Sequence, residues 1–222
     1  MILYRFVYSP YARKVQMLLD LLGAKYELVD VPYSDRTSLA RLTGGYISVP
    51  VLVGTSGEVI VDSRVICESL LREPEASRRL VGGAEMMGPV WAYADFADNI
   101  LEDVLFRIAA PSIRDSWQSE GDRALYVLIK ERRYGAGCVE AWEKDRNALV
   151  TKGQHLLAPT IQTLARRPFL FGDQPTLADA ALYGECAMLE EGHPDLLSRL
   201  SEVLPLYLRR VEAAAQTALQ RR

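Results

Sequence analysis

Ser9 and Pro10 are the first residues along the chain whose types suggest a binding or catalytic site. It joins an apolar run, ILYRFVY (2–8), to an amphipathic segment, ARKVQMLLDLLG (12–23). Pro10 suits the first position of a helix, so Ser9 is expected at the capping position. The amides and dipole of a helix N-terminus favour an anion and lower the pKa of a thiol. Ser9 is therefore either a cap alone or a hydroxyl that donates to a ligand thiolate, with Tyr8 as the alternative donor.

Two further pairs stand at the ends of predicted strands. Proline is tolerated at the first residue of a strand, and a bend at Pro50 would leave the backbone of Val49 free to pair with a peptide-like ligand. Asp62 ends a later strand and Ser63 opens the helix that follows. Ser63 is either a simple N-cap or, together with Asp62, the group that holds the carboxylate and ammonium of a ligand.

Bulk composition excludes several classes of protein. The 222 residues are 49% hydrophobic and 25% charged, which is typical of a globular protein with one large or two small domains. A net charge of -3 and a pI of about 5.6 argue against a nucleic-acid-binding surface. No apolar run approaches the roughly 20 residues of a membrane span. Arg5 and the Arg13–Lys14 pair make the N-terminus unlike a signal peptide.

Cysteines and histidines are few and far apart. Cys67, Cys138 and Cys186 are an odd number without close spacing, which argues against a disulfide framework and a zinc site. His155 and His193 are not at ligand spacing. We therefore expect no metal cofactor and a reducing, cytoplasmic setting.

The first third of the chain alternates between strand and helix patterns. A crossover helix between the first two strands predicts that they are parallel, whereas the short link TSG predicts an antiparallel hairpin. The result is a small mixed sheet with helices on it. The predicted elements are strands at 2–8, 25–31, 49–54 and 58–62, and helices after Pro10, at 35–42 and at 63–73.

After residue 73, few segments have the alternating or β-branched pattern of a strand. A stretch with Pro, Gly and charges at 73–85 is expected to be a linker. The organisation is thus an α/β domain over 1–74 followed by an all-helical domain over 86–222. Helices are predicted at about 87–117, 121–134, 137–166, 176–190 and 195–218.

Thr176 and Asp179 have the spacing of a capping box at the start of one of these helices. The sequence that follows, ALYGECAML, is apolar enough to be buried. We expect a structural role for this pair.

Three stretches together resemble the cytosolic glutathione transferase superfamily, in particular its serine-type, bacterial-like members. They are SPYARKV, then SVPVLV with VDSRVICESL, and finally FLFGDQPTLADAALYG, in the family's order along nearly the whole chain. The resemblance implies a thioredoxin-like N-terminal domain, a helical C-terminal domain and a homodimer. Thr176 and Asp179 match the family's folding motif rather than its active site.

The resemblance also implies roles for five residues. Ser9 matches the serine that stabilises the glutathione thiolate. Val49 and a cis Pro50 match the backbone that pairs with the cysteinyl part of glutathione. Asp62 and Ser63 match the pair that holds the γ-glutamyl end.

The chain departs from the pattern at two positions. Asp62 stands where many members have Glu or Gln, and Ser48 stands where several have Lys. Arg36 and Arg41 are the alternatives for a group that binds the glycine carboxylate.

The expected function is conjugation of glutathione to a small apolar electrophile, as in detoxification. Tyr11, Trp91 and Phe96 are expected to line the second-substrate side. The alternatives are a non-catalytic binding or scaffold protein, and a glutathione-dependent isomerase or reductive-cleavage enzyme.

Overall fold

A four-stranded mixed sheet organises the N-terminal part of the chain in the computed structural model, which describes residues 1–220. The strands are β1 (Ile2–Arg5), β2 (Glu27–Asp30), β3 (Val51–Val53) and β4 (Val59–Val61), in the order β2-β1-β3-β4. As predicted, β1 and β2 are parallel, whereas β3 pairs antiparallel with both β1 and β4. In register, Leu3 lies opposite Leu28 on one side and Leu52 on the other.

Strand β1 is shorter than the apolar run suggests. The chain turns after Arg5, and the amide of Ser9 donates to the carbonyl of Phe6 at 3.0 Å. Tyr8 is therefore in a turn rather than on a strand face. The turn leads directly into α1 (Pro10–Leu21), whose N-terminus it places at the end of the sheet.

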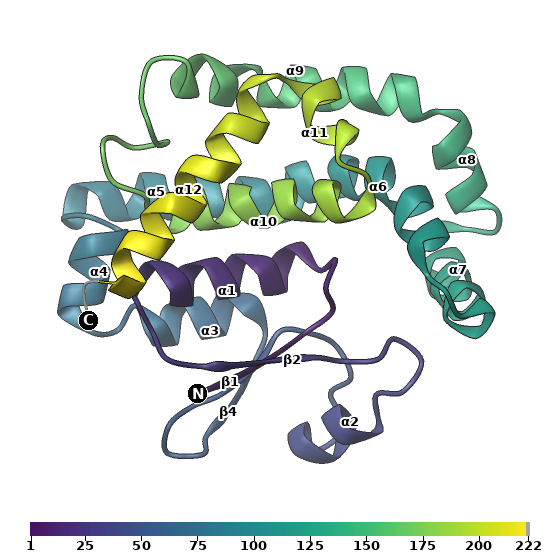
Figure 1. Cartoon of the computed structure of the whole chain (residues 1–222), viewed down its shortest axis with the longest axis horizontal. Coiled ribbons are helices and arrows are strands. Elements are labelled where there is room, and N and C mark those ends of the chain that lie inside the picture. Colours follow the sequence, from purple (N-terminus) through teal and green to yellow (C-terminus); the bar gives the residue numbers. More distant parts are fainter. Residues whose placement is uncertain (221–222) are drawn as a thin grey trace.

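Helices α1 and α3 (Ser63–Leu70) lie between the sheet and the helical domain, as Figure 1 shows. The short helix α2 (Thr37–Thr43) lies on the side of the sheet away from that domain (Figure 1). The fully buried Leu3, Val15 and Leu18 form part of the core between β1 and α1. This is the thioredoxin-like domain followed by a helical domain that the sequence predicts.

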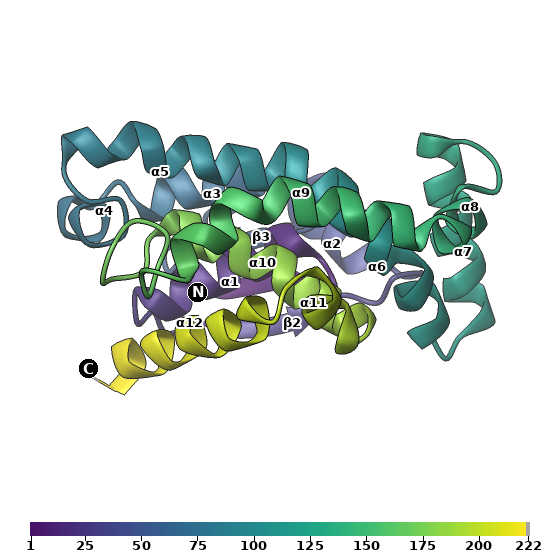
Figure 2. The ribbon, with the colours of Figure 1, turned by 90° about the horizontal axis from the view of Figure 1, so that it is seen from above.

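The remainder of the described chain is helical. Figure 2 shows α7 and α8 grouped at one end of the helical domain and α4 at the other. None of the helices described within residues 1–220 combines the length and apolarity needed to cross a bilayer. The helices are α4 (Pro74–Leu80), α5 (Ala84–Phe96), the π-helical turn η1 (Ala97–Leu101), α6 (Glu102–Ser116), α7 (Glu120–Tyr134), α8 (Cys138–Lys144), α9 (Arg146–Leu164), α10 (Leu177–Gly192), α11 (Asp195–Leu200) and α12 (Val203–Gln220).

Several helices that the hydrophobic periodicity predicts as continuous are interrupted in the structure. The predicted linker contains α4, which begins at Pro74, a residue suited to a first turn. The predicted helix 137–166 divides at Asp145, and the helix 195–218 divides at Ser201. The predicted helix 87–117 contains the π-helical turn η1 between α5 and α6.

The two domains meet where α1 packs on α10. A Cβ atom at Gly184, in α10, would lie 2.3 Å from the carbonyl oxygen of Pro10 and 3.1 Å from the amide nitrogen of Lys14. Only a residue without a side chain permits this approach, because the neighbouring atoms belong to the backbone. The position of α1, and of Ser9 before it, therefore depends on Gly184.

The capping box sets the start of α10. Both the amide and the hydroxyl of Thr176 donate to Asp179 Oδ2, at 2.8 and 2.9 Å. Asp179 Oδ1 accepts from the amide of Leu170 at 3.0 Å and from the hydroxyl of Tyr207 at 2.8 Å. A fully buried carboxylate with four donors joins the preceding loop, α10 and α12, which is the structural role expected for this pair.

We predict that Gly184→Ala lowers the free energy of unfolding by about 1–3 kcal/mol, because the added methyl group forces α1 and α10 apart. Urea denaturation followed by circular dichroism measures the change. Gly88→Ala is the matched control: Gly88 is also helical, nothing lies within 4 Å of its Cβ position, and alanine is the better helix former. Equal stability of the two variants would contradict the close packing of α1 on α10.

Candidate functional site

A cavity of about 610 Å³ lies between the two domains. One wall comes from the turns and helix N-termini at the end of the sheet, and the other comes from α5, η1, α6 and α7. Its lining residues are Phe6, Tyr8, Ser9, Pro10, Tyr11, Tyr33, Arg36, Tyr46, Ser48, Val49, Pro50, Asp62, Ser63, Arg64, Asp95, Asp98, Asn99, Glu102, Phe106, Ile129, Lys130, Arg133 and Tyr134.

Ser9 is the N-cap of α1 and also lines this cavity. Its Oγ accepts a long hydrogen bond of 3.4 Å from the amide of Ala12. Since Oγ acts there as an acceptor, the hydroxyl hydrogen remains able to donate to a ligand. Capping and ligand binding are thus compatible at this residue, and the side chain is buried against the cavity wall.

The Val49–Pro50 peptide bond is cis, and both residues line the cavity just before β3. Within residues 1–220, neither the amide nor the carbonyl of Val49 has a backbone hydrogen-bond partner. The backbone of Val49 can therefore pair with an extended ligand in the cavity.

Asp62, not Ser63, is the N-cap of α3. Its backbone has φ of 75°, and its Oδ1 accepts from the amides of Arg64 at 2.8 Å and Val65 at 3.2 Å. Asp62 Oδ2 has no partner among the described residues and can accept from a ligand ammonium. Ser63 is the buried first residue of α3 and faces the cavity with a free helix N-terminus behind it.

Tyr8 belongs to an aromatic cluster at the edge of the cavity. Its ring centroid lies 5.8 Å from that of Tyr126, 6.1 Å from that of Trp117 and 6.2 Å from that of Tyr33. Burial raises the pKa of the Tyr8 hydroxyl well above its usual value, so the hydroxyl stays protonated. Tyr8 therefore remains a second possible donor on the same wall as Ser9.

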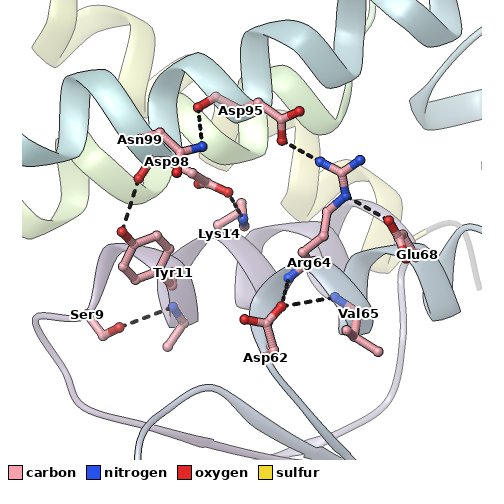
Figure 3. A network of polar contacts seen from close by, with 11 residues as sticks. Ser9, Tyr11, Lys14, Asp62, Arg64, Val65, Glu68, Asp95, Asp98 and Asn99 are labelled. Atoms are coloured by element: carbon pink, nitrogen blue, oxygen red, sulfur yellow. Dashed lines mark hydrogen bonds and ion pairs between the residues drawn. The ribbon is translucent and has the colours of Figure 1, made fainter.

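Tyr11 joins the two walls of the site. Its hydroxyl donates to the backbone carbonyl of Asp98 at 3.0 Å, and Lys14 Nζ donates to the Asp98 carboxylate at 2.5 Å. Figure 3 shows both residues on α1, reaching up to the helix that carries Asp98 and Asn99. Asp98 lies in η1, a π-helical turn of a kind often found at functional sites.

A second connection runs from α3. Arg64 forms ion pairs with Glu68 at 2.7 Å and with Asp95, and its guanidinium lies 4.0 Å from the ring centroid of Trp91 (Figure 3). Trp91 is thus covered by Arg64 and does not line the cavity. Asp62 and Ser9 stand at neighbouring helix N-termini in the same view.

Of the three residues expected on the second-substrate side, only Tyr11 lines the cavity. Phe96 packs against Tyr93, with ring centroids 5.8 Å apart, and lines a separate hollow beside α9. Trp91 lies one turn before Asp95 on the same face of α5, but Arg64 covers its ring, whereas Phe96 lies on another face, beside α9. Aromatic character alone does not identify which face of a helix meets the site.

The structure instead brings together residues whose spacing had no assigned role. Residues 95, 98, 99, 102 and 106 recur at three- and four-residue intervals, and 129, 130, 133 and 134 do so on α7. That periodicity is visible in the sequence. It could have been recognised only if the cavity-facing side of each helix had been known.

Arg36 contacts the loop that leads to the cis proline. Its Nη1 donates to the carbonyl of Ile47 at 3.2 Å and its Nε donates to the carbonyl of Tyr33 at 3.0 Å, while its guanidinium packs over the rings of Phe6 and Tyr33. No carboxylate pairs with Arg36 among the described residues. Arg41, the alternative, does not line the cavity.

The described residues contain no group of three or more His, Cys, Asp or Glu arranged to hold a metal ion. Cys67, Cys138 and Cys186 are free and buried. Burial raises the pKa of the Cys67 thiol to about 11.

The N-terminal domain has a recognisable relationship to known sequences. Residues 3–78 match the family described as "Glutathione S-transferase, N-terminal domain", and this range contains Ser9, the cis Pro50 and Asp62. The N-terminal part of the chain is therefore a glutathione S-transferase N-terminal domain.

Comparison with solved structures extends the fold of this superfamily over both domains. A glutathione S-transferase from Rhodospirillum rubrum F11 is 23% identical with a TM-score of 0.67, over 95% of this chain and 90% of that one. A glutathione transferase from Phanerochaete chrysosporium is 18% identical with a TM-score of 0.76, over 96% of each chain. One from Ceriporiopsis subvermispora, in complex with glutathione, is 17% identical with a TM-score of 0.76, over 94% and 96%.

A curated relative has a different name. The chain is 25% identical to mouse (Mus musculus) "Prostaglandin E synthase 2", over 97% of this chain and 70% of that protein. Proteins similar to this chain therefore have names that describe different reactions.

We predict that Asp98→Ala destabilises this glutathione transferase relative by about 3–5 kcal/mol, because it leaves the buried Lys14 without its partner. The side chains of Lys14 and Asp98 are only 3% and 16% exposed. Asp95→Ala is the control, because the Arg64–Asp95 pair is 43% and 51% exposed and is worth at most about 1 kcal/mol. Urea midpoints of the two variants measure the difference, and equal midpoints would contradict a buried ion pair between the domains.

Proposed function

We propose that this protein is a glutathione transferase that joins the thiolate of glutathione to an electrophilic carbon of a small second substrate. The observation that carries the proposal is the position of Ser9. Its hydroxyl stands at the N-terminus of α1, in one cavity with the unpaired backbone of Val49 and the N-terminus of α3. A volume of about 610 Å³ is in the range of small-molecule sites.

Glutathione would lie along the N-terminal wall. Its γ-glutamyl ammonium would meet Asp62 Oδ2, and its γ-glutamyl carboxylate would meet the hydroxyl and amide of Ser63 at the start of α3. Its cysteinyl backbone would pair with Val49. Arg36 is the group proposed for the glycine carboxylate, because it lines the cavity without an acidic partner.

In this arrangement the protein does two things for the sulfur. The field of the α1 N-terminus and the Ser9 hydroxyl lower the pKa of the thiol, whose proton leaves to water. The same contacts orient the thiolate toward the helical wall, where Phe106 and Tyr134 provide apolar surface for the second substrate. A sulfur–carbon bond then forms, either by addition or with departure of a leaving group.

Ser9→Ala should lower kcat/KM for conjugation by about 10²-fold, because a donor to the developing charge is removed. The pKa of bound glutathione, followed by the ultraviolet absorbance of its thiolate, should rise, while the Kd for glutathione changes little. Tyr8→Phe is the matched variant on the same wall. Should Tyr8→Phe abolish conjugation and Ser9→Ala leave it unchanged, Tyr8 would be the thiolate donor.

Ser63→Ala should weaken glutathione binding about tenfold, since one hydrogen bond to a charged group is worth roughly 1.5 kcal/mol or more. Isothermal titration calorimetry on both proteins measures this. Ser69→Ala, on the same helix but outside the cavity, is the control and should bind as the wild type does. Unchanged binding by the Ser63 variant would remove the N-terminus of α3 from the proposed site.

A different reaction at the same site is the second candidate, because the mouse relative is named as a synthase rather than a transferase. Glutathione-dependent isomerisation or reductive cleavage would use the same thiolate. Glutathione binding without turnover of any electrophile would favour the non-catalytic binding or scaffold alternative. Assembly as a homodimer, a cytoplasmic location and a role in detoxification remain predictions from the family resemblance, and analytical ultracentrifugation tests the first of them.

A further inference from the structure

Two cations on α7 face the cavity from the helical wall. Lys130 and Arg133 are three residues apart, so both project on the same side of the helix, and both line the cavity that Ser9 lines. They stand on the domain opposite the proposed glutathione wall. The proposed contacts of glutathione therefore leave both of them unused.

Neither cation has a fixed acidic partner. Among residues 1–220, no carboxylate oxygen lies within 4.0 Å of Lys130 Nζ or of the Arg133 guanidinium. By contrast, two other cations near this wall form ion pairs: Lys14 with Asp98, and Arg64 with Asp95.

Glu102 is the one acid on this wall without an ion pair among the described residues. Burial raises the pKa of the Glu102 carboxyl. The nearby charges of Arg133 and Lys130 act in the opposite direction but have the smaller effect. Even with Glu102 ionised, two cations face one carboxylate. The wall therefore has an excess of positive charge.

Aromatic rings hold the two cations in place. Lys130 Nζ lies 4.6 Å from the ring centroid of Phe106 and 5.0 Å from that of Tyr126, and the guanidinium of Arg133 lies 5.1 Å from that of Tyr134. Burial, assisted by the Arg133 and Arg36 charges, lowers the pKa of Lys130 to about 8 against the effect of Glu102. A lysine whose ammonium is disfavoured in this way gains from the arrival of an anion.

We propose that the second substrate is an aromatic or unsaturated electrophile that carries a carboxylate, with Lys130 and Arg133 binding that carboxylate. The planar apolar part of the substrate would lie against Phe106 and Tyr134, with its reactive carbon toward the sulfur. This proposal rests on the proposed function, and it replaces an uncharged apolar electrophile with an anionic one.

The test compares two probes of nearly the same size and shape, one anionic and one neutral: 4-chloro-3,5-dinitrobenzoate and 4-chloro-3,5-dinitrobenzamide. In each, the glutathione thiolate forms a bond to the ring carbon, chloride leaves with the electron pair of its bond, and the thiol proton goes to water. We expect kcat/KM, divided by the rate constant of the uncatalysed reaction, to favour the benzoate by at least about tenfold. This corresponds to about 1.4 kcal/mol for one charge-assisted contact.

Binding of the two glutathione conjugates, measured by calorimetry, makes the test independent of turnover. The carboxylate conjugate should bind at least tenfold more tightly than the amide conjugate. Lys130→Gln and Arg133→Gln should each reduce that preference. Arg132→Gln is the control, because Arg132 is exposed on the same helix and does not line the cavity, and it should keep the preference of the wild type.

The outcomes separate this proposal from the proposed function. Equal binding of the two conjugates, or a preference that survives in both the Lys130 and Arg133 variants, overturns the carboxylate site even if both probes are conjugated. Absence of turnover with both probes overturns the transferase proposal, whereas a charge preference in binding would still support the site on α7.

Discussion

The close packing of α1 against α10 is the constraint on which the site depends. Gly184 lets the backbone of α1 approach α10 at Pro10, one residue after Ser9. The buried Lys14–Asp98 pair and the Tyr11 hydroxyl then join the same helix to η1. These contacts set the distance between the sheet and the helical domain, and the cavity is the space that this distance leaves. A side chain at position 184 would therefore displace Pro10, which lines the cavity.

Charges around the cavity are of two kinds, and the difference has a physical basis. Those that join the domains, Lys14 with Asp98 and Arg64 with Asp95, are paired, so little of their field is left for a ligand. Within residues 1–220, three cavity-lining cations have no carboxylate partner, Arg36 on the sheet side and Lys130 and Arg133 on the helical side, against two acids without an ion pair, Asp62 and Glu102. Two helix N-termini add partial positive charge from backbone amides. The site is therefore suited to ligands that carry several negative groups.

The two walls also differ in what they can recognise. The N-terminal wall presents backbone groups and helix ends, which suit an extended peptide-like molecule such as glutathione. The helical wall presents side chains from α6 and α7, where a single substitution changes charge or shape without disturbing the backbone. The mouse protein is named as a synthase and two of the similar solved structures are named as transferases, although all three resemble this chain. We therefore expect that side chains of the helical wall determine which reaction each of these proteins catalyses.

Local sequence determined those features that depend on neighbours in the chain. The Ser-Pro start of α1, the mixed sheet with its TSG hairpin, the helical second domain and the Thr176–Asp179 capping box all followed from short-range patterns, and the structure contains each of them. Tertiary structure alone decided that η1 interrupts a long helix, and that Trp91 is covered by Arg64 while Lys130 faces the cavity. The reason is that hydrophobic spacing reports which face of a helix is buried, but a polar face that meets a cavity has the same spacing as one that meets water.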